Sequence, residues 1–177
     1  MFENIILNEK TGLPEGWALH YSKSKQREYF VNESTKESFW DPPAETDLAK
    51  LKQYLIENPF AVQAKHILIK HEGSRRPYSH RSAAKITLSK EDALKELTKL
   101  RKQIMEIEDE TERFEKFDEI AMKRSDCGSS KNKGDLGIFS KGMMQPSFEN
   151  IAFQLLPGEI SDTFESDSGV HIVWRVA

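Results

Sequence analysis

Two tryptophans, Trp17 and Trp40, frame a short N-terminal stretch that is too small to enclose an ordinary hydrophobic core. Short aromatic runs separated by polar turns predict an antiparallel meander of three strands, at residues 18–21, 28–32 and 37–40. A sheet of this size has almost no interior and is marginal by itself. We therefore expect Trp17, held between Pro14 and Pro43, to clamp the ends of this unit together.

The rest of the chain leaves room for one further domain, and its composition is that of a globular protein. The 177 residues include 31% charged and 37% hydrophobic residues, with a formal net charge of -3. This slightly acidic balance argues against a general nucleic-acid-binding protein, which usually carries a basic excess. No apolar run is long enough for a membrane span, and the N-terminus lacks the basic-then-apolar pattern of a signal peptide.

The chain has one cysteine, Cys127. A lone cysteine excludes an internal disulfide and any zinc site built on several cysteines, and we expect an intracellular, reducing setting. Three of the five histidines cluster in one segment, at His66, His71 and His80, but their spacing fits no standard metal-ligand pattern. We predict neither a metal nor a cofactor.

The N-terminal unit resembles a WW domain over residues 12–43. The resemblance rests on the two tryptophans, on Tyr29-Phe30 between them and on a proline three residues after Trp40. In that family the first tryptophan is structural. The second tryptophan, with the tyrosine at Tyr29, forms a groove for proline in a polyproline-II ligand. The resemblance thus implies a proline-binding groove.

The first loop of this unit, residues 22–27, carries three cations and two hydroxyls beside the expected groove. A solvated loop is the ordinary explanation of such charge. Some WW domains read phospho-Ser/Thr-Pro, and the resemblance to them implies Ser22 and Lys23 as phosphate contacts. Those domains often have arginine where Lys23 stands, and lysine offers a point charge instead of a bidentate fork.

Residues 44–62 are expected to form a helical, semi-rigid linker. They contain no glycine or serine, so their composition excludes a flexible Gly/Ser tether. Leucines recur at helical spacing, at Leu48, Leu51 and Leu55. Thr46 or Asp47 is placed to cap this helix, and Pro59 to end it. Because so short a helix is marginal alone in water, its apolar stripe must lie against one of the domains.

The remaining residues, 63–177, show both strand and helix patterns. Strand patterns occur at residues 64–71, 137–140, 163–164 and 169–176. Helix patterns occupy residues 89–107, 114–121 and 148–155. Ser89 is a predicted cap of the first helix, because a carboxylate follows three residues later. These patterns predict an α+β domain with a mixed sheet surrounded by helices.

Four phrases of this segment resemble the parvulin peptidyl-prolyl isomerases, whose domain is FKBP-like. They are residues 66–69, 125–127, 133–137 and 168–172, in the family's order. A basic loop, residues 70–77, follows the first strand. Among parvulins only the phospho-dependent, Pin-type branch carries such a loop, and in animals and fungi that branch also has an N-terminal WW domain. The resemblance implies a fungal-type peptidyl-prolyl cis-trans isomerase acting on phospho-Ser/Thr-Pro bonds.

Positive charge is concentrated around this loop. Residues 65–85 hold six Lys and Arg residues against one acid, a local charge of about +5 in a chain of net -3. The family assigns phosphate recognition to the positions of Lys70, Arg75 and Arg76. A phosphate dianion accepts strong charge-assisted hydrogen bonds, which suits three adjacent cations. An ordinary solvated loop is the alternative interpretation.

The family's proline pocket corresponds to Leu136, Met144 and Phe148, with Gln145 and Ser168 as polar groups. Apolar side chains at such spacing are more often plain core, so the resemblance carries this assignment. We expect Ser168 to belong to the catalytic set.

The rest of the catalytic set follows from the same resemblance. The family's histidine pair corresponds to His66 and His171, which are expected to meet in the sheet beneath the site and to tune Cys127. Cys127 is expected beside the rotating bond as a polarised thiol or thiolate. Gly128 departs from the serine that more often follows this cysteine.

Rotation about a peptide bond faces a barrier of roughly 18–20 kcal/mol, and lowering it requires no bond to be made or broken. We therefore predict an isomerase that stabilises the twisted amide without covalent chemistry. Two other classes stay open: a cysteine hydrolase built on Cys127, and a non-catalytic phospho-Ser/Thr-Pro adaptor. No recognisable nucleophile or oxyanion motif surrounds Cys127, which weighs against the hydrolase.

The resemblance also implies partners. Fungal and animal relatives act on proline-directed phosphoproteins, including the phosphorylated C-terminal repeats of RNA polymerase II. We expect partners of this kind, no direct nucleic-acid or membrane contact, and a monomer. The chain lacks a strong nuclear-localisation cluster but is small enough to diffuse through nuclear pores, so we expect it in both nucleus and cytoplasm.

Overall fold

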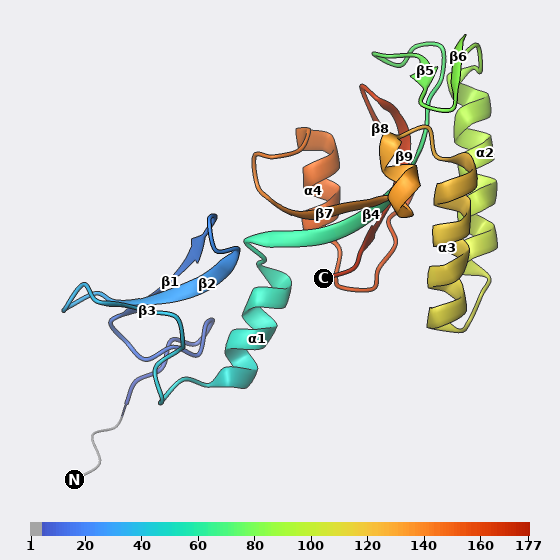
Figure 1. Ribbon diagram of the computed structural model, residues 1–177. Helices are drawn as coiled ribbons and strands as arrows, with labels where there is room; N and C mark the ends of the chain where they lie inside the picture. The colour runs from blue at the N-terminus through green and yellow to red at the C-terminus, as the bar shows by residue number, and fades with distance from the viewer. Residues whose placement is uncertain (1–4) are drawn as a thin grey trace. The chain divides into compact units, whose positions relative to one another are not determined.

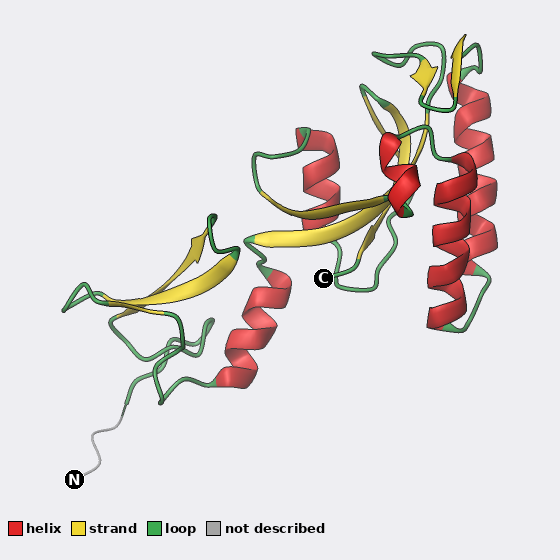
Figure 2. Ribbon diagram, viewed as in Figure 1, coloured by secondary structure: helices red, strands yellow, loops and turns green. Residues whose placement is uncertain are grey.

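The computed structural model describes residues 5–177, and the chain divides into two compact units (Figure 1). The first ends at Ala61 and the second runs from Val62 to Ala177. The first unit has one small sheet and one helix, whereas the second combines a larger sheet with several helices (Figure 2). Within residues 5–177, no helix is both long and apolar enough to cross a membrane. The predicted α+β fold class is confirmed.

The first unit contains the antiparallel meander that the aromatic runs predict. Its strands are β1 (Trp17–Ser22), β2 (Arg27–Asn32) and β3 (Ser38–Phe39). β2 is the central strand, since Phe30 lies opposite Leu19 on β1 and opposite Phe39 on β3. One side of this sheet therefore offers a short apolar row that needs a cover.

The linker helix supplies that cover. Helix α1 (Leu48–Glu57) begins at Asp47, whose carboxylate accepts two backbone N–H groups of the first turn at 3.1 Å each. Leu51 of this helix is buried together with Leu13 and Phe30 in one small cluster. The apolar stripe of the linker thus packs on the sheet of its own unit.

One expectation about this unit is wrong, and another is refined. Leu48 was expected on the apolar stripe but is 62% exposed, because it is the first helical residue and lies one turn short of the cluster around Leu51. Trp17 is only half-buried and packs against that cluster, whose buried members include Leu13, at 1% exposure. The clamp is therefore shared between Trp17 and residues outside the sheet.

The second unit is built on a four-stranded sheet. Its strands are β4 (Ala61–Ile69), β7 (Asp135–Ser140), β8 (Phe164–Ser166) and β9 (Gly169–Arg175). Its helices are α2 (Lys90–Met105), α3 (Glu110–Arg124), the short 3-10 helix η1 (Gly128–Asn132) and α4 (Pro146–Gln154). The strand order is β7-β4-β9-β8, and β9 pairs antiparallel with β4 and with β8. The central pair β4–β9 organises everything that follows.

Helix boundaries follow their caps. Ser89 accepts the backbone N–H of Asp92 at 3.1 Å, as predicted for the start of α2. That helix ends at Met105, two residues before the predicted Ile107. The chain must turn there, because Asp109 already caps the next helix, α3.

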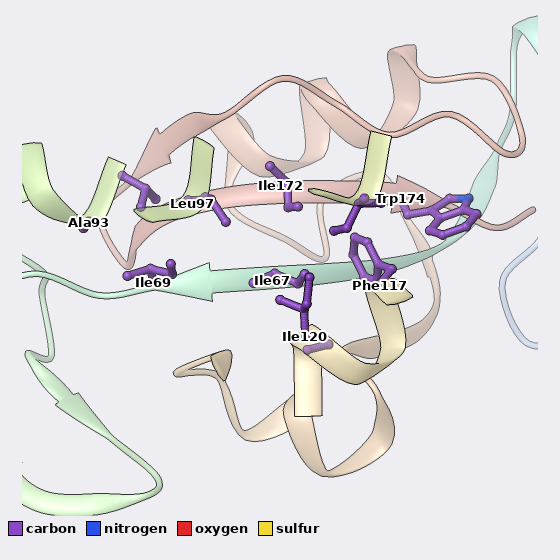
Figure 3. Close-up of a cluster of buried hydrophobic side chains, with 11 residues drawn as sticks. Ile67, Ile69, Ala93, Leu97, Phe117, Ile120, Ile172 and Trp174 are labelled. Carbon is purple, nitrogen blue, oxygen red and sulfur yellow. The ribbon is translucent and has the colours of Figure 1, made fainter. Parts of the chain in front are cut away.

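Helices α2 and α3 cover one face of the sheet and enclose the larger core (Figure 3). Ile67 of β4 and Ile172 of β9 lie opposite each other and point into this core. Phe117 of α3 meets Trp174 of β9 edge to face, with ring centroids 5.4 Å apart. Each fully buried side chain of this size contributes about 1.5–3 kcal/mol, so this face carries most of the unit's hydrophobic stabilisation.

Helix α4 covers the opposite face with a smaller cluster that includes Phe148 and Val173. Successive side chains of a strand point to opposite faces. His66 and His171 are the sequence neighbours of Ile67 and Ile172, so they fall on the α4 face. The pleat alone therefore brings the two histidines to one side of the sheet.

A two-stranded hairpin, β5 (Tyr78–Ser79) with β6 (Ser82–Lys85), lies between β4 and α2 in the sequence. No pattern predicted it, because its strands are too short and polar to show alternation. The hairpin carries the last part of the basic segment.

Candidate active site

His66 and His171 form the centre of the site. They occupy diagonal positions of the β4–β9 pair, and their Nδ1 atoms are 3.3 Å apart. The Nε2 atom of His66 lies 3.1 Å from the hydroxyl of Ser129, and that of His171 lies 2.6 Å from the hydroxyl of Ser166. The two rings are thus the middle of a hydrogen-bonded chain of four side chains.

The electrostatics of the pair keep His171 neutral. Burial, and then the positive charge of His66, lower the pKa of His171 from 6.5 to about 3. A neutral imidazole has one N–H donor and one acceptor nitrogen. His171 therefore donates to one of its two neighbours, His66 or Ser166, and accepts from the other, which locks its ring in place.

Cys127 joins this chain through His66. Burial by itself raises the pKa of the Cys127 thiol, but the hydrogen bond and charge of His66 and two hydrogen bonds from Ser129 outweigh it. Together they lower the pKa from 9.0 to about 6, so the thiolate predominates at neutral pH. Cys127 is the N-cap of η1. The turn of η1 brings Ser129, two residues after Cys127, within hydrogen-bond distance of His66.

A glycine lets η1 approach β4. Gly134, the second residue after the end of η1, has φ +79°, and a Cβ there would collide with the backbone oxygen of His66. The backbone N–H of His66 donates to the Gly134 carbonyl at 3.0 Å. Any side chain at position 134 would push Cys127's segment away from the strand that carries His66.

A cavity of about 160 Å³ opens over the histidine pair. It is lined by His66, Leu136, Met144, Gln145, Phe148, Ser166, Ser168 and His171. The lining therefore includes the four residues predicted for the proline pocket and three of the predicted catalytic set, His66, Ser168 and His171, but not Cys127. Its volume is well below the roughly 300–1,000 Å³ of sites for drug-sized ligands, so it suits one small, mostly apolar side chain.

The basic loop lies against the turn that carries Ser168. The backbone N–H of Arg75 donates to the Asp167 carbonyl at 2.8 Å. The ammonium of Lys70 donates to the carbonyls of Arg76 and Tyr78, at 3.0 and 2.9 Å, so it braces the loop from within. Within residues 5–177, the side chains of Arg75 and Arg76 make no hydrogen bond or ion pair and are exposed. Two guanidinium groups are therefore available to a ligand beside the cavity.

Asp126, directly before Cys127, ties several elements together. Its buried carboxylate accepts the backbone N–H of Lys70 at 2.9 Å and the guanidinium groups of Arg81 and Arg124 at 3.1 Å each. Burial raises the pKa of this carboxyl, but the Lys70 N–H, the charge of Arg124 and a hydrogen bond from Ser79 hold it below its usual value. Asp126 is therefore ionised at neutral pH.

Sequence reasoning did not single out Ser129 and Ser166, although both bond to ring nitrogens of the pair. Serine is common in turns, so a lone serine is a weak signal. Ser166 could have been found, because it lies in the short stretch between the two last predicted strands, the second of which carries His171. It is the hydroxyl of Ser166, and not that of Ser168, that bonds to His171; Ser168 donates its backbone N–H to Ser166 at 3.1 Å.

The first unit has a separate aromatic groove of about 320 Å³. Its lining consists of Tyr21, Ser22, Tyr29, Ser38, Phe39 and Trp40. The rings of Tyr29 and Trp40 lie 5.9 Å apart and nearly edge to face. The predicted pair therefore shares one groove, and Tyr21, Ser38 and Phe39 are further lining residues that sequence reasoning did not name.

Two cations of the loop beside this groove, Arg27 and Lys23, have different surroundings. Arg27 lies over the Trp40 ring at 5.2 Å and donates to the Trp40 carbonyl at 3.0 Å, so it supports the groove from its rim. Lys23 is exposed and has no hydrogen bond or ion pair within the described part of the chain, residues 5–177. Ser22, which lines the groove, accepts the backbone N–H of Lys25 at 3.3 Å.

Protein-family models identify the family of each unit. The model of the PPIC-type PPIase (rotamase) domain matches residues 66–176, and the WW-domain model matches residues 13–43. The chain belongs to the PPIC-type peptidyl-prolyl isomerases. This parvulin, with its WW domain, is an isomerase enzyme, as the family resemblance predicts.

Individual relatives agree with the family assignment. The parvulin is 52% identical to peptidyl-prolyl cis-trans isomerase ESS1 of Saccharomyces cerevisiae over 167 residues, which cover 94% of this chain and 95% of the relative. It is 41% identical to peptidyl-prolyl cis-trans isomerase pin1 of Schizosaccharomyces pombe, covering 94% and 98%. The solved structure of peptidyl-prolyl isomerase ESS1 from Candida albicans is similar at a TM-score of 0.62 and 38% identity, covering 97% of this chain and 100% of that one. The parvulin is thus of the Pin1/ESS1 type.

Proposed function

We propose that this isomerase acts on phospho-Ser/Thr-Pro bonds and that its basic loop provides the selectivity. The observation that carries the proposal is the pair of exposed guanidinium groups, Arg75 and Arg76, on a loop bonded to the turn that lines the cavity. A proline in the cavity has its preceding residue at the cavity's rim. A phosphate on that residue would lie within reach of the two arginines, which bind dianions through charge-assisted hydrogen bonds.

The chemistry at the rotating bond is non-covalent. A planar amide is stabilised by resonance, and the barrier falls when the site favours the twisted form over both planar forms. The apolar walls Leu136, Met144 and Phe148 hold the ring away from water. As the bond rotates, the backbone carbonyl of the residue before proline can then face the polar edge of the cavity, where Gln145 and the histidine pair lie.

Cys127 contributes charge to this polar edge. Planar amides concentrate negative charge on their oxygen, and twisting reduces it because resonance is lost. A thiolate bonded to His66, which lines the cavity, would disfavour the more negative planar oxygen and so favour the twisted form. In this account Cys127 attacks nothing, so Cys127→Ser should lower kcat/KM through the loss of the thiolate charge without abolishing isomerase activity.

The WW domain serves as a separate binding site for the same motif. Its groove offers the Tyr29–Trp40 aromatic pair to proline, and Lys23 with Ser22 to a phosphate. We propose that it recruits phosphoproteins, including the phosphorylated C-terminal repeats of RNA polymerase II, to a monomeric enzyme present in nucleus and cytoplasm. Titrating such a phosphorylated repeat peptide into wild type and Trp40→Ala tests this role. Equal peptide affinities of the two proteins would contradict recruitment by the WW domain.

A protease-coupled isomerisation assay tests the catalytic proposal. The full chain is assayed on three otherwise identical peptides with phospho-Ser, Glu or Ala before proline. We expect kcat/KM to be highest for phospho-Ser, lower for Glu and lowest for Ala, because only the dianion uses both arginines. Equal values for all three peptides would contradict phosphate selectivity. Binding of the phosphopeptide without turnover of any peptide would instead indicate an adaptor.

A further inference from the structure

Arg81 makes a set of contacts that substrate recognition does not require. It occupies the turn between β5 and β6. Its guanidinium donates to the carbonyls of Lys123 and Arg124 at the end of α3, the latter at 2.8 Å, and to the carboxylate of Asp126 at 3.1 Å. A planar group with five fixed donors suits three acceptors that converge at one place. The hairpin is thereby bonded to the residues just before Cys127.

The neighbouring residue of the same turn reaches the other side of Cys127. Nε2 of His80 lies 2.8 Å from the hydroxyl of Ser130. Ser130 is 2% exposed and lies in η1, three residues after Cys127. Two adjacent residues of one turn therefore hold the segments on both sides of the cysteine.

Other contacts already stabilise Asp126. Its carboxylate also accepts the Lys70 N–H and the Arg124 guanidinium, and Arg124 pairs in addition with Glu96 at 3.0 Å. The position of Cys127 thus has support without Arg81. The hairpin does not, because its two short strands are largely exposed and too short to be stable by themselves.

From this arrangement we infer that Arg81 is a positioning residue: its contacts with the end of α3 and Asp126, helped by His80 with Ser130, form a clasp that fixes the basic loop relative to Cys127. The clasp couples phosphate capture at Arg75 and Arg76 to the rotating bond. A displacement of about 1 Å at such a site can cost as much as 100-fold in rate. The inference rests on the proposed phosphate selectivity and extends it to a residue that need not touch substrate.

The decisive variant is Arg81→Gln in the full chain, and Lys85→Gln is its matched control. Lys85 lies in the same hairpin, and its side chain has no hydrogen bond or ion pair within residues 5–177. Both variants remove one positive charge, but only the first opens the clasp. We expect Arg81→Gln to reduce kcat/KM about tenfold for the phospho-Ser-Pro peptide and less than about twofold for the Ala-Pro peptide. Lys85→Gln should change both by less than about twofold.

A double-mutant cycle separates positioning from a plain structural role. If the clasp acts through the two arginines, Arg81→Gln has no further effect on phosphopeptide turnover once Arg75→Ala and Arg76→Ala are present. Additive effects would overturn the inference, as would an equal loss on phospho-Ser and Ala peptides. Should Arg81→Gln fold poorly by circular dichroism, His80→Gln opens the other half of the clasp and is expected to give a smaller loss in the same direction.

The same peptide measurements distinguish a failure of the clasp from a failure of the proposed phosphate selectivity. A wild type that prefers the phosphopeptide, with an Arg81→Gln variant that keeps the full preference, overturns the clasp and leaves the proposed function standing. A wild type without any preference overturns both.

Discussion

The WW unit exposes the tryptophan of its aromatic groove, whereas the isomerase unit buries the histidine pair of its cavity. Trp40 is 45% exposed, while His66 and His171 are 5% and 4% exposed. A groove that only binds proline needs flat aromatic surface, which the edge of a small sheet can present. A site that tunes a thiol and locks two imidazole rings needs burial and neighbours, which only a larger core can supply.

The same difference explains how each unit is held together. The WW sheet relies on a three-residue cluster completed by Leu51 from the linker helix. The isomerase sheet is covered on both faces, and it also encloses a charged pair, Lys65 with Asp118, whose Nζ and Oδ1 atoms are 2.6 Å apart. Destabilising substitutions should therefore act through loss of a buried ion pair in the isomerase unit and through loss of apolar packing in the WW unit.

The largest expected effect is on the buried ion pair. Asp118→Ala leaves the ammonium of Lys65 uncompensated beneath the sheet, and removing one partner of such a pair costs about 3–5 kcal/mol. Urea unfolding of the full chain, followed on the isomerase unit, measures the loss. The control is Glu119→Ala, whose pairs with Lys116 and Lys123 lie at the surface, where solvent screens them, so its loss of stability should be much smaller. Equal losses in the two variants would contradict a structural role for the buried pair.

The next effect falls on the WW unit. Leu51→Ala empties one third of its small cluster and should cost about 2–5 kcal/mol, enough to unfold so small a sheet. NMR signals of the Trp17 and Trp40 indoles should lose their dispersion, while that of Trp174 in the isomerase unit stays unchanged. Leu48→Ala, at an exposed position of the same helix, should have almost no effect. Loss of the Trp174 signal in Leu51→Ala would show that the units do not fold independently.

Sequence patterns predicted most of the helices and longer strands, for identifiable reasons. The predicted caps, Ser89 and Thr46 or Asp47, and the apolar strand patterns around His66 and His171 are local signals, and the structure contains the elements that they predict, with Asp47 as the cap. The grouping of the cavity residues came from family resemblance, because spacing cannot tell Met144 from ordinary core.

What sequence could not predict depends on long-range pairing. Asp118 lies 53 residues from Lys65, and Arg81 lies 45 residues from Asp126. A lysine inside an apolar strand signals that a partner must exist, but not which one. Arg81 was counted only as one of six cations in its segment, because nothing local separates a clasp from a solvated charge.

The lowered pKa of Cys127 predicts a smaller effect. The pKa of Cys127 is lowered to about 6, so the reactive thiolate forms as the pH rises through 6. Alkylation by iodoacetamide should therefore reach half its maximal rate near pH 6, and His66→Gln should move that midpoint upward by about one unit or more. His80→Gln, which removes a histidine bonded to Ser130, should not move it. A wild-type midpoint near 9 would contradict the tuned thiol.

The same lowered pKa has a consequence for stability. The folded value lies below the ordinary value of 9.0, so the stabilising contribution is complete above pH 9 and is lost as the pH falls through 6. The slope from one such group is at most about 1.4 kcal/mol per pH unit. The difference in unfolding free energy between wild type and Cys127→Ser, measured at pH 5 and pH 8, should therefore be larger at pH 8. No change in that difference would argue against the shift.

The most direct test of the account asks which region turns phosphate recognition into isomerisation. NMR exchange spectroscopy on a phospho-Ser-Pro peptide compares wild type, Trp40→Ala and the double variant Arg75→Ala with Arg76→Ala. Each lost charge-assisted hydrogen bond is worth about 1.5–3 kcal/mol, or roughly a tenfold to hundredfold drop in kcat/KM. The account predicts such a drop for the arginine variant on the phosphopeptide, a smaller one on a Glu-Pro peptide, almost none on an Ala-Pro peptide, and near-wild-type catalysis for Trp40→Ala. An equal slowing of all three peptides by the arginine variant, or full phosphopeptide turnover without the two arginines, would contradict it.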